Sequence, residues 1–118
     1  MLEVDVVRIS VIVPIYNVKL YIERCVRSLM EQTLENIEFI FVNDCTPDDS
    51  MDILHYVLEE YPKRREQIKI IEHETNRGIS AVRNTGLKNA TGQYIIYCDS
   101  DDWVEKNMYE KLLVKALE

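Results

Sequence analysis

Four short apolar runs alternate along the chain with segments in which apolar residues recur every three or four positions. The runs cover residues 6–14, 37–44, 68–73 and 93–99, and they are rich in Val and Ile. Short runs of β-branched residues that end near Pro, Asn or Asp are typical of buried strands. A spacing of three or four is typical of one face of a helix. The pattern therefore predicts four strands, each followed by a helix.

The expected helices begin after turn-forming residues. Asn17 is predicted to cap the first helix, and the turn at 46–50 is predicted to start the second, which Pro62 ends. The third helix is expected within 76–92. The last is expected directly after Trp103, with an apolar stripe formed by Val104, Met108, Leu112 and Ala116.

Strict alternation of strands and helices predicts an α/β fold with a Rossmann-like, mostly parallel sheet and helices on both faces. The 118 residues suit one domain, 1–118. In such sheets, ligands bind beyond the carboxyl ends of the strands. Polar clusters follow all four predicted strands, at 14–17, 43–44, 76–78 and 99–102. We therefore expect the ligand site on this rim of the sheet.

Three carboxylates crowd the end of the fourth predicted strand. Asp99 and Asp101 flank one residue, so that in an extended stretch both side chains would point the same way. Like charges this close repel, and a bound divalent cation would relieve the repulsion. Carboxylate oxygens are also the ligands that Mg²⁺ and Mn²⁺ prefer. The alternative is a solvated acidic turn. Asp102 fits either a site residue or the cap of the last helix.

Other rim residues offer complementary chemistry. The Asp44 carboxylate only accepts hydrogen bonds, so it suits a base with an imino N–H, such as uracil or guanine. Tyr16 could stack on a base. Arg77, Arg83 and the backbone amides near Gly78 could bind phosphate. The structural alternatives are a helix cap for Asp44, a core rim position for Tyr16, and surface ion pairs for the arginines.

The net charge and the cysteine count limit which partners the protein can bind and in which cellular compartment it is expected. The net charge is −7, and the densest basic stretch, at 63–65, is expected to be a solvated turn. The sequence therefore argues against nucleic-acid binding. Cys25, Cys45 and Cys98 are odd in number and scattered. This favours reduced thiols in a cytoplasmic protein over disulfides or a zinc site.

Five motifs carry a resemblance to a known family. They are SVIVPIYN at 10–17, SL at 28–29 with QT at 32–33, FVNDCTPDDS at 41–50, NRGISAVRNTGL at 76–87 and GQYIIYCDSDDW at 92–103. In this order and spacing the chain resembles glycosyltransferase family 2, the inverting enzymes of GT-A fold that use nucleotide-sugar donors. The resemblance runs from about Ile9 to Met108.

The resemblance implies a role for each matching residue on the donor side. Pro14 and Tyr16 would pack on the donor's base. Asp44 would bind the uracil imino group, and Arg83 would lie near the ribose and phosphates. The donor would then be a nucleoside diphosphate sugar, with UDP favoured.

The same resemblance implies a metal-dependent reaction. Asp99 would face the ribose side of the donor, and Asp101 would ligate the Mn²⁺ or Mg²⁺ that bridges the diphosphate, with Asp99 beside it. A general base would deprotonate an acceptor hydroxyl, which would attack the anomeric carbon with inversion. The acceptor would be a saccharide, a lipid-linked group or a protein, in the synthesis of a polysaccharide or glycoconjugate.

The chain departs from the family in length. Members are usually about twice as long or longer, and their second half carries the acceptor site and the catalytic carboxylate. We therefore expect 1–118 to be the donor-binding part, with the general base beyond Glu118 and no transfer by this part alone. An apolar surface left uncovered would favour self-association. The expected location is the cytoplasm or the inner face of the membrane.

Other functions remain as alternatives. One is a nucleotide-binding fragment without turnover. Another is a GT-A-like nucleotidyltransferase, although the Gly-rich basic loop that it needs after the first strand is absent. A phosphohydrolase or a receiver domain would carry its acids after the first strand, where this chain has Pro14, Ile15 and Tyr16.

Overall fold

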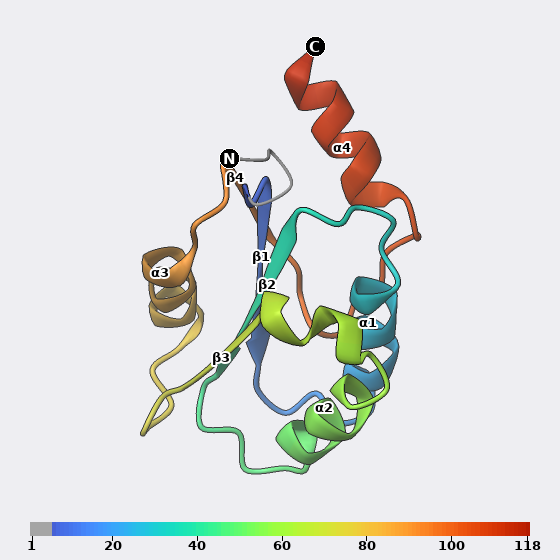
Figure 1. The fold of residues 1–118 in the computed structure, drawn as a ribbon. Coiled ribbons are helices and arrows are strands. Elements are labelled where there is room, and N and C mark those ends of the chain that lie inside the picture. Colours follow the sequence, from blue (N-terminus) through green and yellow to red (C-terminus); the bar gives the residue numbers. More distant parts are fainter. Residues whose placement is uncertain (1–5) are drawn as a thin grey trace.

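The computed structural model describes residues 6–118, and strands and helices alternate along them as predicted (Figure 1). A short 3₁₀ helix, η2, adds one further turn before the third strand. In chain order the elements are β1 (Ile9–Ile15), α1 (Ile22–Met30), β2 (Ile37–Asn43), α2 (Ser50–Leu58), η2 (Pro62–Gln67), β3 (Ile68–Glu72), α3 (Ile79–Asn89), β4 (Tyr94–Tyr97) and α4 (Met108–Leu117).

The four strands form one parallel sheet in the order β3-β2-β1-β4. β1 and β2 lie in the centre, where Ile9 pairs with Ile37 and Ile15 with Asn43. Nearly every residue of these two strands is buried, because helices cover both faces of the sheet. Strands covered on both sides carry continuous apolar runs. The predicted α/β fold with a parallel, Rossmann-like sheet is confirmed.

The strand order reverses at β1. The chain places β2 and then β3 on one side of β1, and it then returns through α3 so that β4 pairs with the other side. In open sheets of this kind, the ligand crevice lies beyond the carboxyl ends of the strands at such a reversal. The loop after β1 and the turn after β4 therefore flank the place where a ligand is expected.

Helices cover the two faces unequally. α1 and α2 lie together on one face, and α3 lies alone on the other (Figure 1). α3 packs against β1 and β2 through Val82 and Gly86. Gly86 permits this close approach, because a Cβ at that position would lie within 3.0 Å of side-chain atoms of the buried Ile12.

The predicted start of the first helix is wrong. Asn17 does not cap α1, which begins at Ile22. Asn17 has a φ of 53°, and its backbone N–H donates to the hydroxyl of Thr46 at 2.8 Å. The segment between β1 and α1 is therefore held against the loop that comes after β2, and the helix begins only at Ile22.

The predicted start of the last helix is also wrong. α4 begins at Met108, so Val104 precedes the helix and packs against the core as part of a loop. The expected stripe is consequently shifted, and α4 buries Tyr109 and Leu113. Met108 is 40% exposed and Leu112 is 48% exposed. Figure 1 shows α4 projecting away from the sheet.

The basic stretch at 63–65 is only partly solvated. The Arg64 guanidinium donates to the backbone carbonyls of Met30, Gln32 and Leu34. It thereby binds the carbonyls that the end of α1 and the following loop leave unpaired. The prediction of a solvated turn is wrong for Arg64. Within residues 6–118, no helix has both the length and the apolar character that crossing a membrane requires.

Candidate functional site

The loops after β1 and β2 lie against each other on the rim of the sheet. Pro14 is part of β1, opposite Val42 of β2. Tyr16 follows the strand and is 43% exposed. The backbone N–H of Asp44 donates to the Ile15 carbonyl at 3.0 Å, which joins the two loops beside Tyr16. The Tyr16 ring is therefore not part of the core, and it is available for stacking.

Asp44 is a buried carboxylate with three hydrogen-bond donors. Nδ1 of His73 lies 2.8 Å from its Oδ1, to which the backbone N–H of Arg77 also donates, at 2.9 Å. The backbone N–H of Gly78 donates to Oδ2 at 2.9 Å. Burial raises the pKa of this carboxyl, but the three bonds outweigh it and hold the pKa below its usual range. Asp44 is therefore ionised at neutral pH.

This network decides between interpretations that the sequence left open. The backbone N–H groups of Arg77 and Gly78, which could have faced a ligand anion, donate to the Asp44 carboxylate. Gly78 has a φ of 92°, a conformation that favours glycine, and its N–H points at the carboxylate. Asp44 is also not a helix cap, because the residue at the start of α2 is Asp49.

The sequence did not predict His73 as a partner of Asp44. His73 lies directly after β3, and its backbone N–H donates to the carbonyl of Asn43 at the end of β2. The two side chains meet because β2 and β3 are neighbours in the sheet. Only the strand order could have revealed this pair.

A second network joins the loops after β1 and β2. Asp48 accepts hydrogen bonds from the hydroxyls of Thr46 and Ser50 at 2.7 and 2.6 Å and from the backbone N–H groups of Lys19 and Ser50. Burial raises the pKa of Asp48, but these donors lower it to about 2. The two loops that carry Tyr16 and Asp44 are therefore held together at ordinary pH.

Asp99, Asp101 and Asp102 lie in an exposed turn after β4, here called the acidic turn (99–102). Carboxylate oxygens of the three lie within 4.8 Å of one another. β4 ends at Tyr97, and the Asp102 N–H donates to the Asp99 carbonyl at 3.0 Å. A turn, and not the expected extended strand, therefore brings the carboxylates together. Asp102 precedes the first residue of α4 by six positions, which excludes the helix-cap alternative.

The acidic turn fits a divalent cation. Three carboxylate oxygens at this spacing can share one ion, and oxygen ligands are those that Mg²⁺ and Mn²⁺ prefer. All three side chains are exposed, so that an ion held there would keep coordination positions for water or for the phosphate oxygens of a ligand.

Two side chains, Ser28 of α1 and Gln32 just after this helix, hold the segment that follows the acidic turn. The hydroxyl of Ser28 accepts the N–H of Val104 at 3.2 Å. The side-chain amide of Gln32 donates to the Glu105 carbonyl at 2.6 Å and accepts the Tyr109 N–H at 3.1 Å. The sequence shows Ser28 and Gln32 one helical turn apart in a motif of the resemblance, but it does not show what they bind. They fix the acidic turn relative to α1.

Two buried thiols lie under the acidic turn. The sulfur atoms of Cys25 and Cys98 lie 3.9 and 3.7 Å from the Asp99 carbonyl oxygen. Hydrogen bonding with Cys98 and burial raise the pKa of Cys25 well above its usual range, so this thiol stays protonated. These two cysteines and the exposed Cys45 are free thiols, as predicted.

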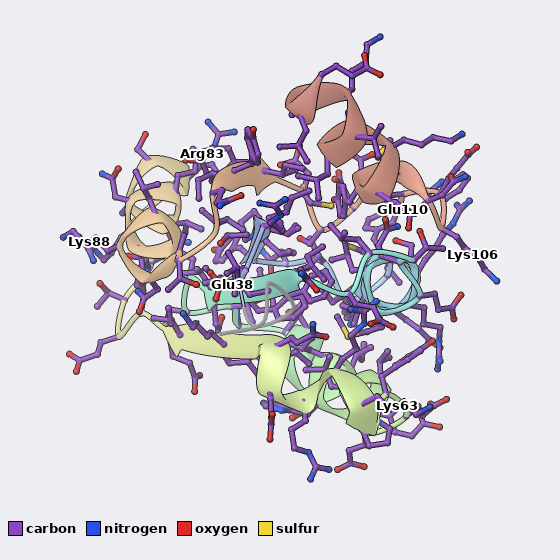
Figure 2. The ribbon with its side chains drawn as sticks, turned by 45° about the horizontal axis from the view of Figure 1, so that its top comes forward. Glu38, Lys63, Arg83, Lys88, Lys106 and Glu110 are labelled. Carbon is purple, nitrogen blue, oxygen red and sulfur yellow. The ribbon has the colours of Figure 1, made fainter. Side chains whose placement is uncertain are left out.

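Arg83 lies on α3 beside β4, as Figure 2 shows. Its guanidinium lies 5.2 Å from the ring centroid of Tyr97, the last residue of β4. Tyr97 precedes Asp99 by two positions, so α3 brings this cation toward the acidic turn. Arg77 is exposed as well, but the contact that ties it to the site is the bond from its backbone N–H to Asp44.

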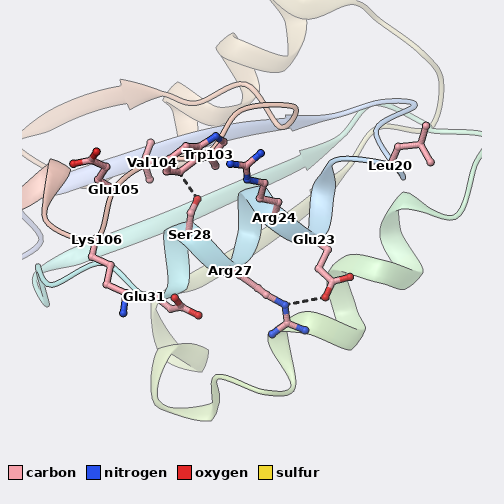
Figure 3. Close-up of a pocket in the computed structure, with 10 residues that line it drawn as sticks. All are labelled: Leu20, Glu23, Arg24, Arg27, Ser28, Glu31, Trp103, Val104, Glu105 and Lys106. Atoms are coloured by element: carbon pink, nitrogen blue, oxygen red, sulfur yellow. Dashed lines mark hydrogen bonds and ion pairs between the residues drawn. The ribbon is translucent and has the colours of Figure 1, made fainter.

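A groove of about 700 Å³ lies between α1 and residues 103–106 (Figure 3). Arg24 and Trp103 both line this groove, and the Arg24 guanidinium lies 4.4 Å from the ring centroid of Trp103. The hydrogen bond between Ser28 and Val104 crosses its floor. None of the six residues predicted to bind donor or metal lines this groove. The predicted donor site is therefore the rim and not the groove.

Comparison with known proteins gives consistent similarities. The profile of the family described as Glycosyl transferase family 2 matches residues 10–118. The chain is 48% identical over 108 residues to the uncharacterized glycosyltransferase EpsJ of Bacillus subtilis (strain 168). The aligned residues make up 92% of this chain and 30% of EpsJ. The chain therefore spans about a third of that relative's length.

Solved structures share the fold. The structure of S. aureus TarS 1-349 in complex with UDP superposes with a TM-score of 0.78 at 32% identity and covers 91% of this chain and 31% of TarS 1-349. The mannosyltransferase PcManGT from Pyrobaculum calidifontis, in complex with GDP-Man and Mn²⁺, gives a TM-score of 0.75 at 28% identity and covers 81% of this chain and 28% of that one. With a family profile that spans nearly all of its residues, the chain belongs to glycosyltransferase family 2.

Proposed function

We propose that this chain forms the donor-binding part of a metal-dependent glycosyltransferase that transfers a sugar from a nucleoside diphosphate sugar, with inversion, to an acceptor hydroxyl. The observation that carries the proposal is the pairing of two chemically different groups on one rim. A buried, ionised acceptor, Asp44, follows β2, and the exposed acidic turn follows β4. They lie on either side of β1, where the strand order reverses.

The base side of the site consists of Pro14, Tyr16 and Asp44. Asp44 accepts an imino N–H from the base, because an ionised carboxylate has no hydrogen to donate. Tyr16 offers its exposed ring to the face of the base, beside Pro14. UDP is favoured over GDP, and TarS, whose structure contains UDP, supports this choice.

The phosphate side consists of the acidic turn and Arg83. Asp101 and Asp99 would hold Mn²⁺ or Mg²⁺, and a bound ion supplies Lewis-acid stabilisation of the charge that develops on the departing diphosphate. Arg83 adds a positive charge from α3 on the same side. The PcManGT structure, which contains GDP-Man and Mn²⁺, supports a metal in such a site.

Acceptor binding and proton removal complete the proposed reaction. The general base is proposed to lie outside residues 1–118, in a region corresponding to the remaining length of relatives such as EpsJ. The donor-binding part alone then binds the nucleotide without transferring the sugar. A saccharide, lipid-linked or protein acceptor in polysaccharide or glycoconjugate synthesis fits this chemistry. The cytoplasm, which keeps thiols reduced, is the proposed location.

Titration calorimetry of the chain with UDP tests the function. We expect UDP to bind in the presence of Mn²⁺, to bind at least about tenfold more weakly in EDTA, and to bind more tightly than GDP. Circular dichroism establishes that the titrated chain is folded. A folded chain that binds neither UDP nor GDP in Mn²⁺ would contradict the proposal.

We also propose that the chain self-associates through the exposed apolar side chains of α4. These are Met108, Leu112, Val114 and Leu117. Apolar side chains gain free energy when a second copy of the chain removes them from water. Light scattering after size-exclusion chromatography should show a mass that rises with concentration, and replacing Leu112 and Val114 with Ser should abolish the rise. A monomer at every concentration would rule this out.

A further inference from the structure

His73 is a buried titratable side chain to which the proposed reaction gives no role. It is 9% exposed and lies between Asp44 of the rim and Thr85 of α3. Its backbone N–H donates to the Asn43 carbonyl at 2.8 Å. His73 is therefore held at three points: its backbone N–H and the two nitrogens of its ring.

The contacts determine which ring nitrogen of His73 carries a hydrogen. Nδ1 lies 2.8 Å from Oδ1 of Asp44, and an ionised carboxylate only accepts hydrogen bonds. Nδ1 therefore carries the hydrogen and donates it. Nε2 lies 2.7 Å from the hydroxyl of Thr85, which can donate or accept and so suits either protonation state of the ring.

Among residues 6–118, the donors around Asp44 leave one of its acceptor positions for a ligand. A carboxylate offers about four acceptor positions, two on each oxygen. On Oδ1, His73 and the Arg77 N–H take both. On Oδ2, the Gly78 N–H takes one. The position that remains is on Oδ2, and its direction depends on how the carboxylate is held.

We propose that His73 is a positioning residue that fixes the Asp44 carboxylate for a base imino N–H, and thereby sets the preference for uridine over cytidine nucleotides. The inference rests on the proposed function. Uracil offers an N–H where cytosine offers a bare nitrogen acceptor, so a fixed carboxylate attracts the first and repels the second. A carboxylate released from His73 can turn away from cytosine and loses part of this discrimination.

The test is the ratio of the dissociation constants of CDP and UDP in Mn²⁺. The two ligands share ribose and phosphates, so a change confined to the fold or to the acidic turn would leave the ratio unchanged. We expect a ratio of about 10–100 for the wild type, the range for one hydrogen bond to a charged group. His73→Ala should lower the ratio at least about fivefold. His73→Asn, whose amide can donate in place of Nδ1, should keep it within about threefold.

His55→Ala is the matched control, because His55 is the other histidine of the chain and is exposed on α2. It should leave the ratio unchanged. A folded His73→Ala chain with the wild-type ratio would overturn the inference alone. A wild type that binds UDP and CDP equally would overturn the role of Asp44 in the proposed function, and the inference with it.

A spectroscopic measurement on the wild type covers the case in which His73→Ala does not fold. The Nδ1 hydrogen of His73 should give a slowly exchanging NMR resonance that moves on addition of UDP and moves less on addition of CDP. A ring that carries its hydrogen on Nε2 alone, or a resonance that responds equally to both nucleotides, would overturn the inference.

Discussion

Replacing Asp101 with Asn should weaken Mn²⁺-dependent UDP binding at least about 100-fold, the upper end of the loss seen for residues that merely support a metal ligand. The amide removes the negative charge and is a poorer ligand than a carboxylate. Binding in EDTA should not change. The thermal midpoint without metal should stay the same or rise slightly, because the substitution relieves repulsion within the acidic turn.

Asp52→Asn is the control for charge, because Asp52 is exposed on α2 and its replacement changes the net charge equally. Calorimetry with UDP in Mn²⁺ and in EDTA measures both variants. If the Asp101 variant kept the wild-type difference between these two conditions, the acidic turn would not be the metal site.

Asp44→Asn is expected to lower the free energy of unfolding by about 2–3 kcal/mol and to abolish selective UDP binding. The amide nitrogen must face one of the donors around the side chain, which leaves a buried hydrogen-bonding group unpaired. Denaturant unfolding measures the loss, and the exposed Glu74→Gln, which removes one charge from the loop after β3, is the control.

The loss should depend on pH in a definite direction. The folded-state pKa of Asp44 is lowered from the ordinary value of 3.8, so the carboxylate stabilises the fold fully above pH 3.8 and less as the pH falls through the folded-state pKa. The stability difference between wild type and Asp44→Asn should therefore shrink below pH 3.8. A difference that grew in acid would mean that the three hydrogen bonds do not favour the ionised form.

The sequence was most informative about the strands and least informative about the loops. β1 and β2 are buried on both faces, so their apolar runs are continuous and unmistakable. The start of α1 was mispredicted because hydrogen bonds to Thr46 and Asp48, in a different loop, hold residues 17–19 outside the helix. Local sequence contains no trace of such distant partners.

The candidate site could be predicted only as a set of positions. Parallel strands bring their carboxyl ends to one rim, so the convergence of Tyr16, Asp44 and the acidic turn follows from the strand pattern alone. The pairing of Asp44 with His73 does not, because it requires β2 and β3 to be neighbours. The same applies to Gln32, which reaches residues more than seventy positions away in the chain.

The contacts that hold Asp44 through His73 and those that hold the acidic turn come from opposite faces of the sheet. Asp44 is held through His73 by Thr85 of α3, on one face of the sheet. The segment after the acidic turn is held by Ser28 of α1 and by Gln32, which follows α1, on the opposite face. Substitutions at His73 or Thr85 that alter the choice of nucleobase can therefore accumulate on one face while the contacts that hold the acidic turn stay intact. This separation offers a family a route to new donors in which each evolutionary step preserves a working half of the site.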